Sequence, residues 1–119
     1  MTGAQTDLIQ VSKFEQATAI LLHIAHQLFY KAIHDRQSEE VAFLAWCVLR
    51  MIAERFLITR APILTPGERE RLIGALKVSH DLTHPGHESV PVEQCTCLMS
   101  LTQRELMMVL AEAEAEARQ

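Results

Sequence analysis

Five side chains that can coordinate zinc gather in one part of the sequence. They are His80, His84, His87, Cys95 and Cys97. Imidazole nitrogen and thiolate sulfur are the usual protein ligands of zinc, so this segment could form a metal site. However, Pro85 disfavours the helical conformation that His84 would need to share a helix face with His80. The spacing of the two cysteines is also not the common Cys-x-x-Cys knuckle. Ordinary polar histidines beside two small buried cysteines account for the same residues. We therefore expect no bound metal, and keep a zinc-binding helical module as the alternative.

The same segment could also hold a thiol nucleophile. A cysteine, Cys95 or Cys97, with a histidine nearby is one arrangement used in nucleophilic catalysis. No glycine-rich turn and no positioned acid accompanies either cysteine, and the four glycines of the chain form no phosphate-binding loop. The sequence therefore predicts a protein with no catalytic residue and no cofactor, and we expect it not to be an enzyme.

Two long helices precede this segment. Ser12 and Glu15 form a capping box, and apolar residues then recur at spacings of three and four as far as Leu28, which predicts a helix over residues 13–34. Ser38 is a suitable N-cap for a second helix over residues 39–59. Because the link between them is short, the two helices should form an antiparallel hairpin.

Two further helices are predicted from their start signals. Thr65 and Glu68 form a second capping box, with proline at the first helical position, and predict a helix over residues 66–78. Thr102 and Glu105 form a third box and predict a helix over residues 103–117. The proline- and glycine-containing stretch between these helices is expected to be the main loop. The sequence thus predicts one all-α domain over residues 1–119, a four-helix bundle built around the long antiparallel hairpin.

The second arm of the hairpin is unusually apolar. The segment from Val41 to Ala53 contains a single charge, Arg50. A helix that is apolar nearly all round must be covered on every side, and one neighbouring helix cannot cover two opposed faces. Tryptophan, tyrosine and arginine are also favoured as anchors of protein interfaces. We therefore predict a partner or dimer interface that contains Tyr30, Phe43, Trp46, Arg50 and Leu57, and we expect a homodimer that buries Phe43 and Trp46 between its subunits.

Composition and charge argue against nucleic acid and membranes as partners. The net charge is −4 and no basic stripe occurs, which argues against nucleic acid as a partner. No apolar run approaches the about 18–20 residues of a membrane-spanning helix, so we expect no membrane partner. The first residues lack the basic start and apolar run of a signal peptide, which favours a cytoplasmic protein. The three cysteines are expected to be free thiols in that compartment.

The Ser12–Ile58 hairpin, in a short chain without catalytic residues, resembles the small all-helical bacterial anti-activators typified by the QslA family of quorum sensing. The resemblance implies a regulator that binds another protein and blocks its assembly, in that family a transcriptional activator of the LuxR type. No functional residue of the family can be carried over, because the resemblance lies in the layout and not in a motif. The predicted function is a non-enzymatic regulator that sequesters or inhibits a partner protein through an apolar helix surface.

Overall fold

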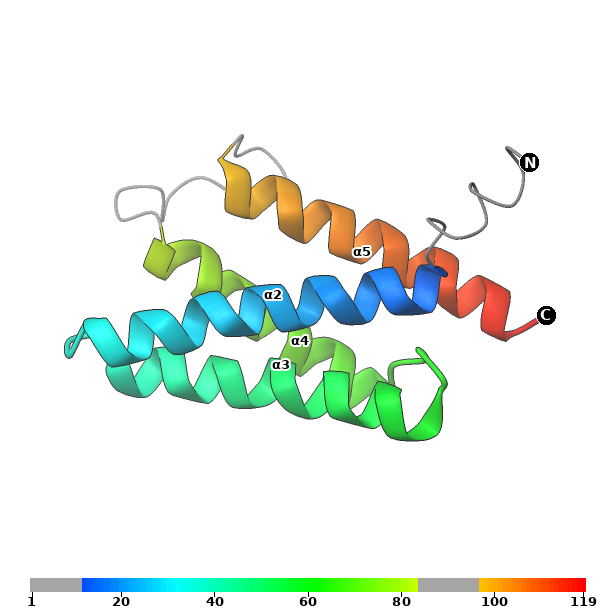
Figure 1. Ribbon diagram of the computed structural model, residues 1–119, viewed down its shortest axis with the longest axis horizontal. Coiled ribbons are helices and arrows are strands. Elements are labelled where there is room, and N and C mark those ends of the chain that lie inside the picture. The colour runs from blue at the N-terminus through cyan, green and yellow to red at the C-terminus, as the bar shows by residue number, and fades with distance from the viewer. Residues whose placement is uncertain (1–11, 84–96) are drawn as a thin grey trace, which may run out of the picture.

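The computed structural model describes residues 12–83 and 97–119, which contain four α-helices and no strand (Figure 1). The helices are α2 (Lys13–His34), α3 (Glu39–Thr59), α4 (Pro66–Thr83) and α5 (Leu98–Ala117). The predicted all-α helical bundle is confirmed. The two helices of the hairpin, α2 and α3, begin and end at the residues predicted from their caps and apolar spacing.

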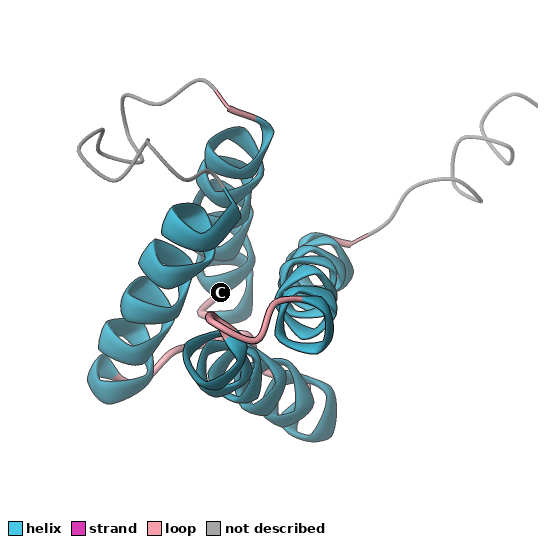
Figure 2. Ribbon diagram, turned by 90° about the vertical axis from the view of Figure 1, so that its left-hand side faces the viewer, coloured by secondary structure: helices cyan, strands magenta, loops and turns pink. Residues whose placement is uncertain are grey.

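The helices run up and down, so that each is antiparallel to the next along the chain (Figure 1). The most extensive contact joins α2 to α3, while α4 packs on α3 and α5 packs on α2. The contact between α4 and α5 is smaller. Seen from the end where α2 turns into α3, the four helices surround a shared interior (Figure 2). None of the helices in residues 12–83 and 97–119 is both long enough and apolar enough to cross a membrane.

The interior is filled by aliphatic side chains from all four helices, with one large ring, that of Phe56, fully buried among them. Burying such side chains supplies most of the free energy that holds helices together. The most deeply buried of the larger aliphatic residues are Leu21, Ile24, Leu28, Leu49, Ile52, Leu72, Leu106 and Val109.

One predicted capping box is complete, at Thr65 and Glu68, and at Ser12 and Glu15 the Ser12 side chain caps the helix while its hydroxyl also donates to the Glu15 carboxylate at 3.2 Å. The Ser12 hydroxyl accepts a hydrogen bond from the Glu15 N–H at 3.1 Å. At the start of α4, the Thr65 hydroxyl accepts from the Glu68 N–H at 3.1 Å, and the Glu68 carboxylate accepts from the Thr65 N–H at 3.0 Å. These bonds satisfy N–H groups that have no partner inside the helix, which fixes the residue at which each helix begins.

The third predicted box is wrong, and both α4 and α5 are longer than the sequence suggested. The predicted helix over residues 66–78 continues to Thr83, and the helix predicted over residues 103–117 already begins at Leu98. Cys97 is the actual N-cap of α5, since its sulfur accepts from the Ser100 N–H at 3.4 Å. Thr102 lies inside the helix, where its hydroxyl donates to the Leu98 carbonyl at 2.9 Å.

Packing between the end of α4 and the start of α5 explains this extra length. The Gln103 amide is buried and donates to the Leu76 carbonyl of α4 at 2.8 Å. The Ser79 hydroxyl donates to the sulfur of Met99 at 3.6 Å. Ser79 and Met99 lie in the stretch that the sequence suggested as a loop, and this contact between the two helices outweighs the weak local preference for a turn.

The link between α2 and α3 is closed by Asp35 and not by a side-chain cap from Ser38. Ser38 occupies the N-cap position, as predicted, but its hydroxyl donates to the Asp35 carboxylate at 3.0 Å. That carboxylate also accepts from the Gln37 N–H at 3.1 Å and meets the Lys31 ammonium at 3.2 Å. Lys31 first, and then Ser38, hold the pKa of Asp35 below its ordinary value.

The opposite end of the hairpin is closed by Arg60. This residue ends α3 in the left-handed conformation, with φ 56°, and its N–H donates to the Phe56 carbonyl at 2.8 Å. Its guanidinium lies over the ring of Phe14, 4.7 Å from the ring centroid. Because Phe14 belongs to the first turn of α2, this contact joins the beginning of one helix to the end of the other.

Candidate protein-binding surface

An aromatic cluster lies on the outer side of the α2–α3 pair. The ring of Trp46 is 5.3 Å from that of Phe29 and 5.0 Å from that of Phe43, centroid to centroid, and both pairs are tilted. The Arg50 guanidinium lies 5.0 Å from the centroid of the Trp46 ring. Tilted ring pairs and a cation over an aromatic face are both attractive arrangements, so they hold Trp46 in one position. We call Phe29, Phe43, Trp46 and Arg50 the aromatic cluster.

Three members of the cluster, Phe29, Trp46 and Arg50, line an open groove of about 300 Å³ between α2 and α3, and Phe43 packs on Trp46 beside it. Phe29 and Phe43 are 38% and 45% exposed, although both are large apolar side chains. The charged groups beside them are already paired, since Arg50 Nε donates to Glu54 at 2.7 Å. The groove therefore offers an apolar surface with one neutralised ion pair at its edge. Its lining residues are Leu22, Ala25, His26, Phe29, Trp46, Arg50 and Glu54.

A second apolar surface runs along α3 next to the cluster. Leu44, Met51 and Ile58 are spaced by seven residues, close to two helical turns, and are 59%, 68% and 81% exposed. The half-buried Cys47 lies between the first two. We call these four residues the outer strip of α3. The core-facing side of the same helix is occupied by other residues, so α3 is apolar on more than one face, as its sequence indicated.

The structure brings together three of the five residues predicted for the interface. Phe43, Trp46 and Arg50 are in contact within the aromatic cluster. Leu57 is 45% exposed on the same helix but does not line the groove. Tyr30 is 58% exposed and stacks on His34, 4.2 Å between ring centroids, away from the groove lining. The interface role of all five residues stays a prediction.

The groove residues of α2 were not identified from the sequence. Phe29 directly follows Leu28, the last residue of the apolar series in the first helix, and it turns outward and joins Trp46. Leu22, also on the outer side, is 42% exposed. The available signal was the width of the stripe itself, because an apolar face wider than one neighbour can cover must leave residues such as Phe29 at its edge.

The proposed zinc ligands are only partly within the described residues. His84, His87 and Cys95 lie outside them. His80 is 1% exposed and its Nδ1 lies 3.6 Å from an oxygen of Asp81. Cys97 is half-buried, and its sulfur is used as the cap of α5. Within residues 12–83 and 97–119, no three histidine, cysteine or acidic side chains come together as a potential metal site. The sequence-based zinc alternative stays a prediction.

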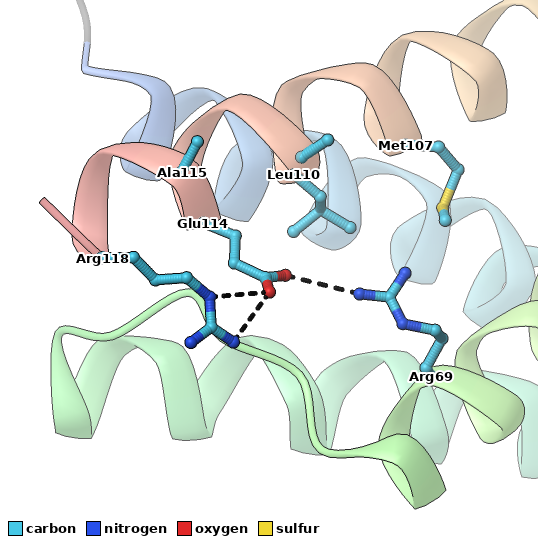
Figure 3. A pocket seen from close by; sticks show the side chains of 7 residues that line it. Arg69, Met107, Leu110, Glu114, Ala115 and Arg118 are labelled. Carbon is cyan, nitrogen blue, oxygen red and sulfur yellow. Dashed lines mark hydrogen bonds and ion pairs between the residues drawn. The ribbon is translucent and has the colours of Figure 1, made fainter.

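A separate pocket of about 320 Å³ lies between the first turns of α4 and the end of α5 (Figure 3). Glu114 stands between two arginines: Arg69 reaches it from α4 at 3.4 Å, and Arg118 approaches from α5 at 3.0 and 3.2 Å. Met107 and Leu110 supply part of the apolar wall. The two guanidinium groups are about half exposed or more, so each pair contributes only about 0–1 kcal/mol to stability. The Arg69–Glu114 ion pair connects the end of α5 to α4.

A less exposed ion pair holds the connection between α3 and α4. Arg55 donates to both oxygens of Glu68, at 2.6 and 2.7 Å, and to the Ile63 carbonyl at 2.7 Å. Burial raises the pKa of Glu68, but the bonds from Arg55 and from the Thr65 N–H outweigh burial and hold that pKa below its ordinary value. The pair is a structural tie and lies apart from the aromatic cluster.

Comparison with known proteins leaves the surface features as the basis for assigning function. No protein-family model, no curated protein and no solved structure matches this chain.

Proposed function

We propose that this chain is a non-enzymatic regulatory protein that binds a partner protein through the apolar outer surface of α2 and α3. The aromatic cluster is the observation that carries the proposal. Trp46 is held between Phe29, Phe43 and Arg50 at the edge of an open groove, and the two phenylalanines expose more than a third of their surface. Large apolar side chains exposed together mark interaction sites in soluble proteins.

The chemistry of the groove favours a partner with an apolar helix face. A groove between two helices suits a third helix that inserts apolar residues at spacings of three and four. The Arg50–Glu54 pair leaves the edge of the groove with little net charge, so a strongly basic or acidic ligand has no counterpart there. From the resemblance to quorum-sensing anti-activators, we propose a transcriptional activator as the partner and inhibition as the outcome, with the regulator in the cytoplasm and itself a homodimer.

Affinity capture with matched variants tests this proposal. Wild type, Trp46→Ala and Met108→Ala would each be tagged and used to capture proteins from the native host. Met108 is 58% exposed on α5, which contributes no residue to the cluster or to the groove lining, so its truncation removes apolar surface outside the candidate site. We expect a protein captured by wild type and Met108→Ala to be lost with Trp46→Ala. Equal capture by all three variants would show that the aromatic cluster is not the binding site.

Folding and self-association must be measured on the same samples. Far-ultraviolet circular dichroism shows whether Trp46→Ala keeps its helices, and sedimentation shows whether it keeps its oligomeric state. A folded variant with unchanged sedimentation and lost capture supports partner binding by the cluster. The inhibitory role is then tested by adding the protein to the captured activator in a transcription reaction. Unchanged transcription would contradict the proposed inhibition, while the binding site itself would stand.

A further inference from the structure

We infer that the pocket between α4 and α5 binds a small organic anion with one carboxylate on a short apolar chain (Figure 3). Arg69 pairs with the carboxylate, with Arg118 beside it, and the apolar wall of α5 holds the chain. The inference goes beyond the proposed function, because this pocket shares no lining residue with the aromatic groove of α2 and α3. The shape of the pocket, its charge and its unused hydrogen-bond donors support a ligand of this kind.

The walls of the pocket suit a short hydrocarbon chain. The contact between α4 and α5 is small, and the side chains of Ala111 and Ala115, one turn apart on α5, are too short to fill the space between the helices. Met107 and Leu110 add larger apolar surfaces, and Leu110 is fixed in the core. The volume of about 320 Å³ lies at the lower end of the range for small-molecule sites, so the ligand is small.

The charged side chains that line the pocket leave an excess of one positive charge. They are Arg69 and Arg118 against a single acid, Glu114. The neighbouring acid Glu112 meets the Lys13 ammonium of α2 at 3.0 Å and does not line the pocket. A ligand with one negative charge balances the excess. A phosphate group, with about two negative charges, would be repelled more strongly by Glu114.

Arg69 is held less tightly than the arginine of the structural pair between α3 and α4. It donates one hydrogen bond to Glu114, at 3.4 Å, which is longer than the about 2.7–2.9 Å of a strong charge-assisted bond. Arg55, in contrast, donates twice to Glu68, at 2.6 and 2.7 Å. Within residues 12–83 and 97–119, the remaining N–H groups of the Arg69 side chain make no hydrogen bond. They form the fork of donors that matches the two oxygens of a carboxylate.

Octanoate is the probe, and the methionine methyl groups report where it binds. In nuclear magnetic resonance spectra of protein with labelled methionine methyl groups, Met107 reports on the pocket and Met51, 68% exposed on α3, on apolar surface elsewhere. We expect a saturable shift of the Met107 signal, with a dissociation constant of about 1 mM or lower, and no shift of Met51. Acetate, which lacks the chain, should bind at least about tenfold more weakly. Octanamide, which lacks the charge, should bind at least about threefold more weakly.

Substitutions separate the contributions of charge and shape. Arg69→Gln should weaken octanoate binding by about threefold to tenfold, and Glu114→Gln, which removes a competing carboxylate, should strengthen it by about threefold. Ala111→Leu fills the pocket without changing a charge and should weaken binding at least about fivefold. Arg71→Gln is the matched control, because Arg71 is exposed on α4 outside the pocket lining. It changes the net charge as Arg69→Gln does, and binding should stay within about twofold of wild type.

Circular dichroism checks that each variant keeps its helices, and Ala115→Leu supplies a second way to fill the pocket. Binding at Met107 that weakens with Arg69→Gln and with a filled pocket, but not with Arg71→Gln, supports the inference. No saturable shift up to about 10 mM octanoate overturns it. Equal shifts of Met107 and Met51 also overturn it, since octanoate would then adsorb to apolar surface in general. Equal losses in Arg69→Gln and Arg71→Gln do the same, because the net charge of the protein would then attract the anion.

Discussion

Arg50 contacts the face of Trp46 and the carboxylate of Glu54 at the same time, with 5.0 Å from guanidinium carbon to ring centroid and 2.7 Å from Nε to Oε1. The guanidinium is thereby fixed by a neighbour on each side. The Glu54 carboxylate neutralises the charge of the guanidinium. The flat face of the guanidinium extends the apolar surface formed by the tryptophan. An arginine in this position can be covered by an apolar partner without leaving an unpaired charge, which is the condition for its use inside an interface.

We expect Trp46→Ala to weaken partner binding by about 2 kcal/mol or more, roughly 30-fold in the dissociation constant, because central aromatic anchors carry most of an interface's energy. Tyr30→Ala should cost less, since Tyr30 stacks on His34 outside the groove lining. Titration calorimetry with the captured partner measures both. A larger loss for Tyr30→Ala would move the binding site to the exposed side of α2.

Thr65 and Thr102 were both predicted to cap helices, but their replacement by alanine should change the free energy of unfolding by different amounts. Thr65→Ala removes a hydroxyl that accepts the Glu68 N–H at the start of α4, and should lower the free energy of unfolding by about 1 kcal/mol. Thr102→Ala lies inside α5, where its hydroxyl only donates back to the Leu98 carbonyl, and should change stability by less than about 0.5 kcal/mol. Urea unfolding compares the two. Equal losses would indicate that Thr102 does cap the helix.

Stability should fall in acid partly because of Glu68. Its folded pKa lies below the ordinary value of 4.5, so the unfolded chain binds the proton more readily. The contribution is therefore fully present above about pH 4.5 and is lost as the pH falls through the lower, folded pKa. Glu68→Gln should be less stable than wild type at neutral pH and should show a shallower decline below pH 4.5. The measurement is urea unfolding at several pH values.

Asp35 provides the comparison for that experiment. Its pKa is also lowered, but it lies in the link between α2 and α3, whereas Glu68 pairs with Arg55 at the connection between α3 and α4. The pH dependence that remains in Glu68→Gln should be reduced further in the double variant with Asp35→Asn. If Glu68→Gln keeps the full slope of wild type, the Arg55–Glu68 pair does not contribute to acid sensitivity.

Chelation should leave the fold intact. The described helices are held by an aliphatic core, and the sulfur of Cys97 accepts a hydrogen bond from the Ser100 N–H. A structural zinc ion would instead contribute folding free energy directly. We expect unchanged helical circular dichroism after dialysis against a chelator, and no stoichiometric zinc by elemental analysis. Zinc in the purified protein, with loss of helicity on its removal, would establish the zinc-binding module in place of our proposal.

The hairpin could be predicted to the residue because its signals are local and agree. Ser12 caps α2, apolar residues follow at helical spacing, and the short link allows only an antiparallel return. The end of α4 and the beginning of α5 could not be predicted, because they depend on contacts between residues distant in sequence. The bond from Ser79 to the sulfur of Met99 is such a contact, since both residues lie in the stretch that the sequence suggested as a loop.

The same contrast between local signals and contacts distant in sequence applies to the candidate surface. Phe43, Trp46 and Arg50 come together because they lie on one side of a single helix, which helical spacing alone decides, and their interface role stays a prediction. Phe29 and Tyr30 belong to the other helix. Which of them reaches the groove depends on how α2 is rotated against α3, and core packing sets that rotation.

The contact of Arg60 with Phe14 joins the two helices of the hairpin at the end where they are not linked by the chain. At the opposite end, the chain itself connects them through the link that contains Asp35. A pair of helices usually opens from its free ends, and here the beginning of α2 and the end of α3 are in contact with each other. Amide hydrogens in the first turn of α2 and the last turn of α3 should therefore exchange with solvent together. Arg60→Gly would relieve a left-handed conformation that costs about 1–2 kcal/mol, yet release the contact that joins the ends. Global stability would then rise while the resistance of these two helix ends to local opening falls.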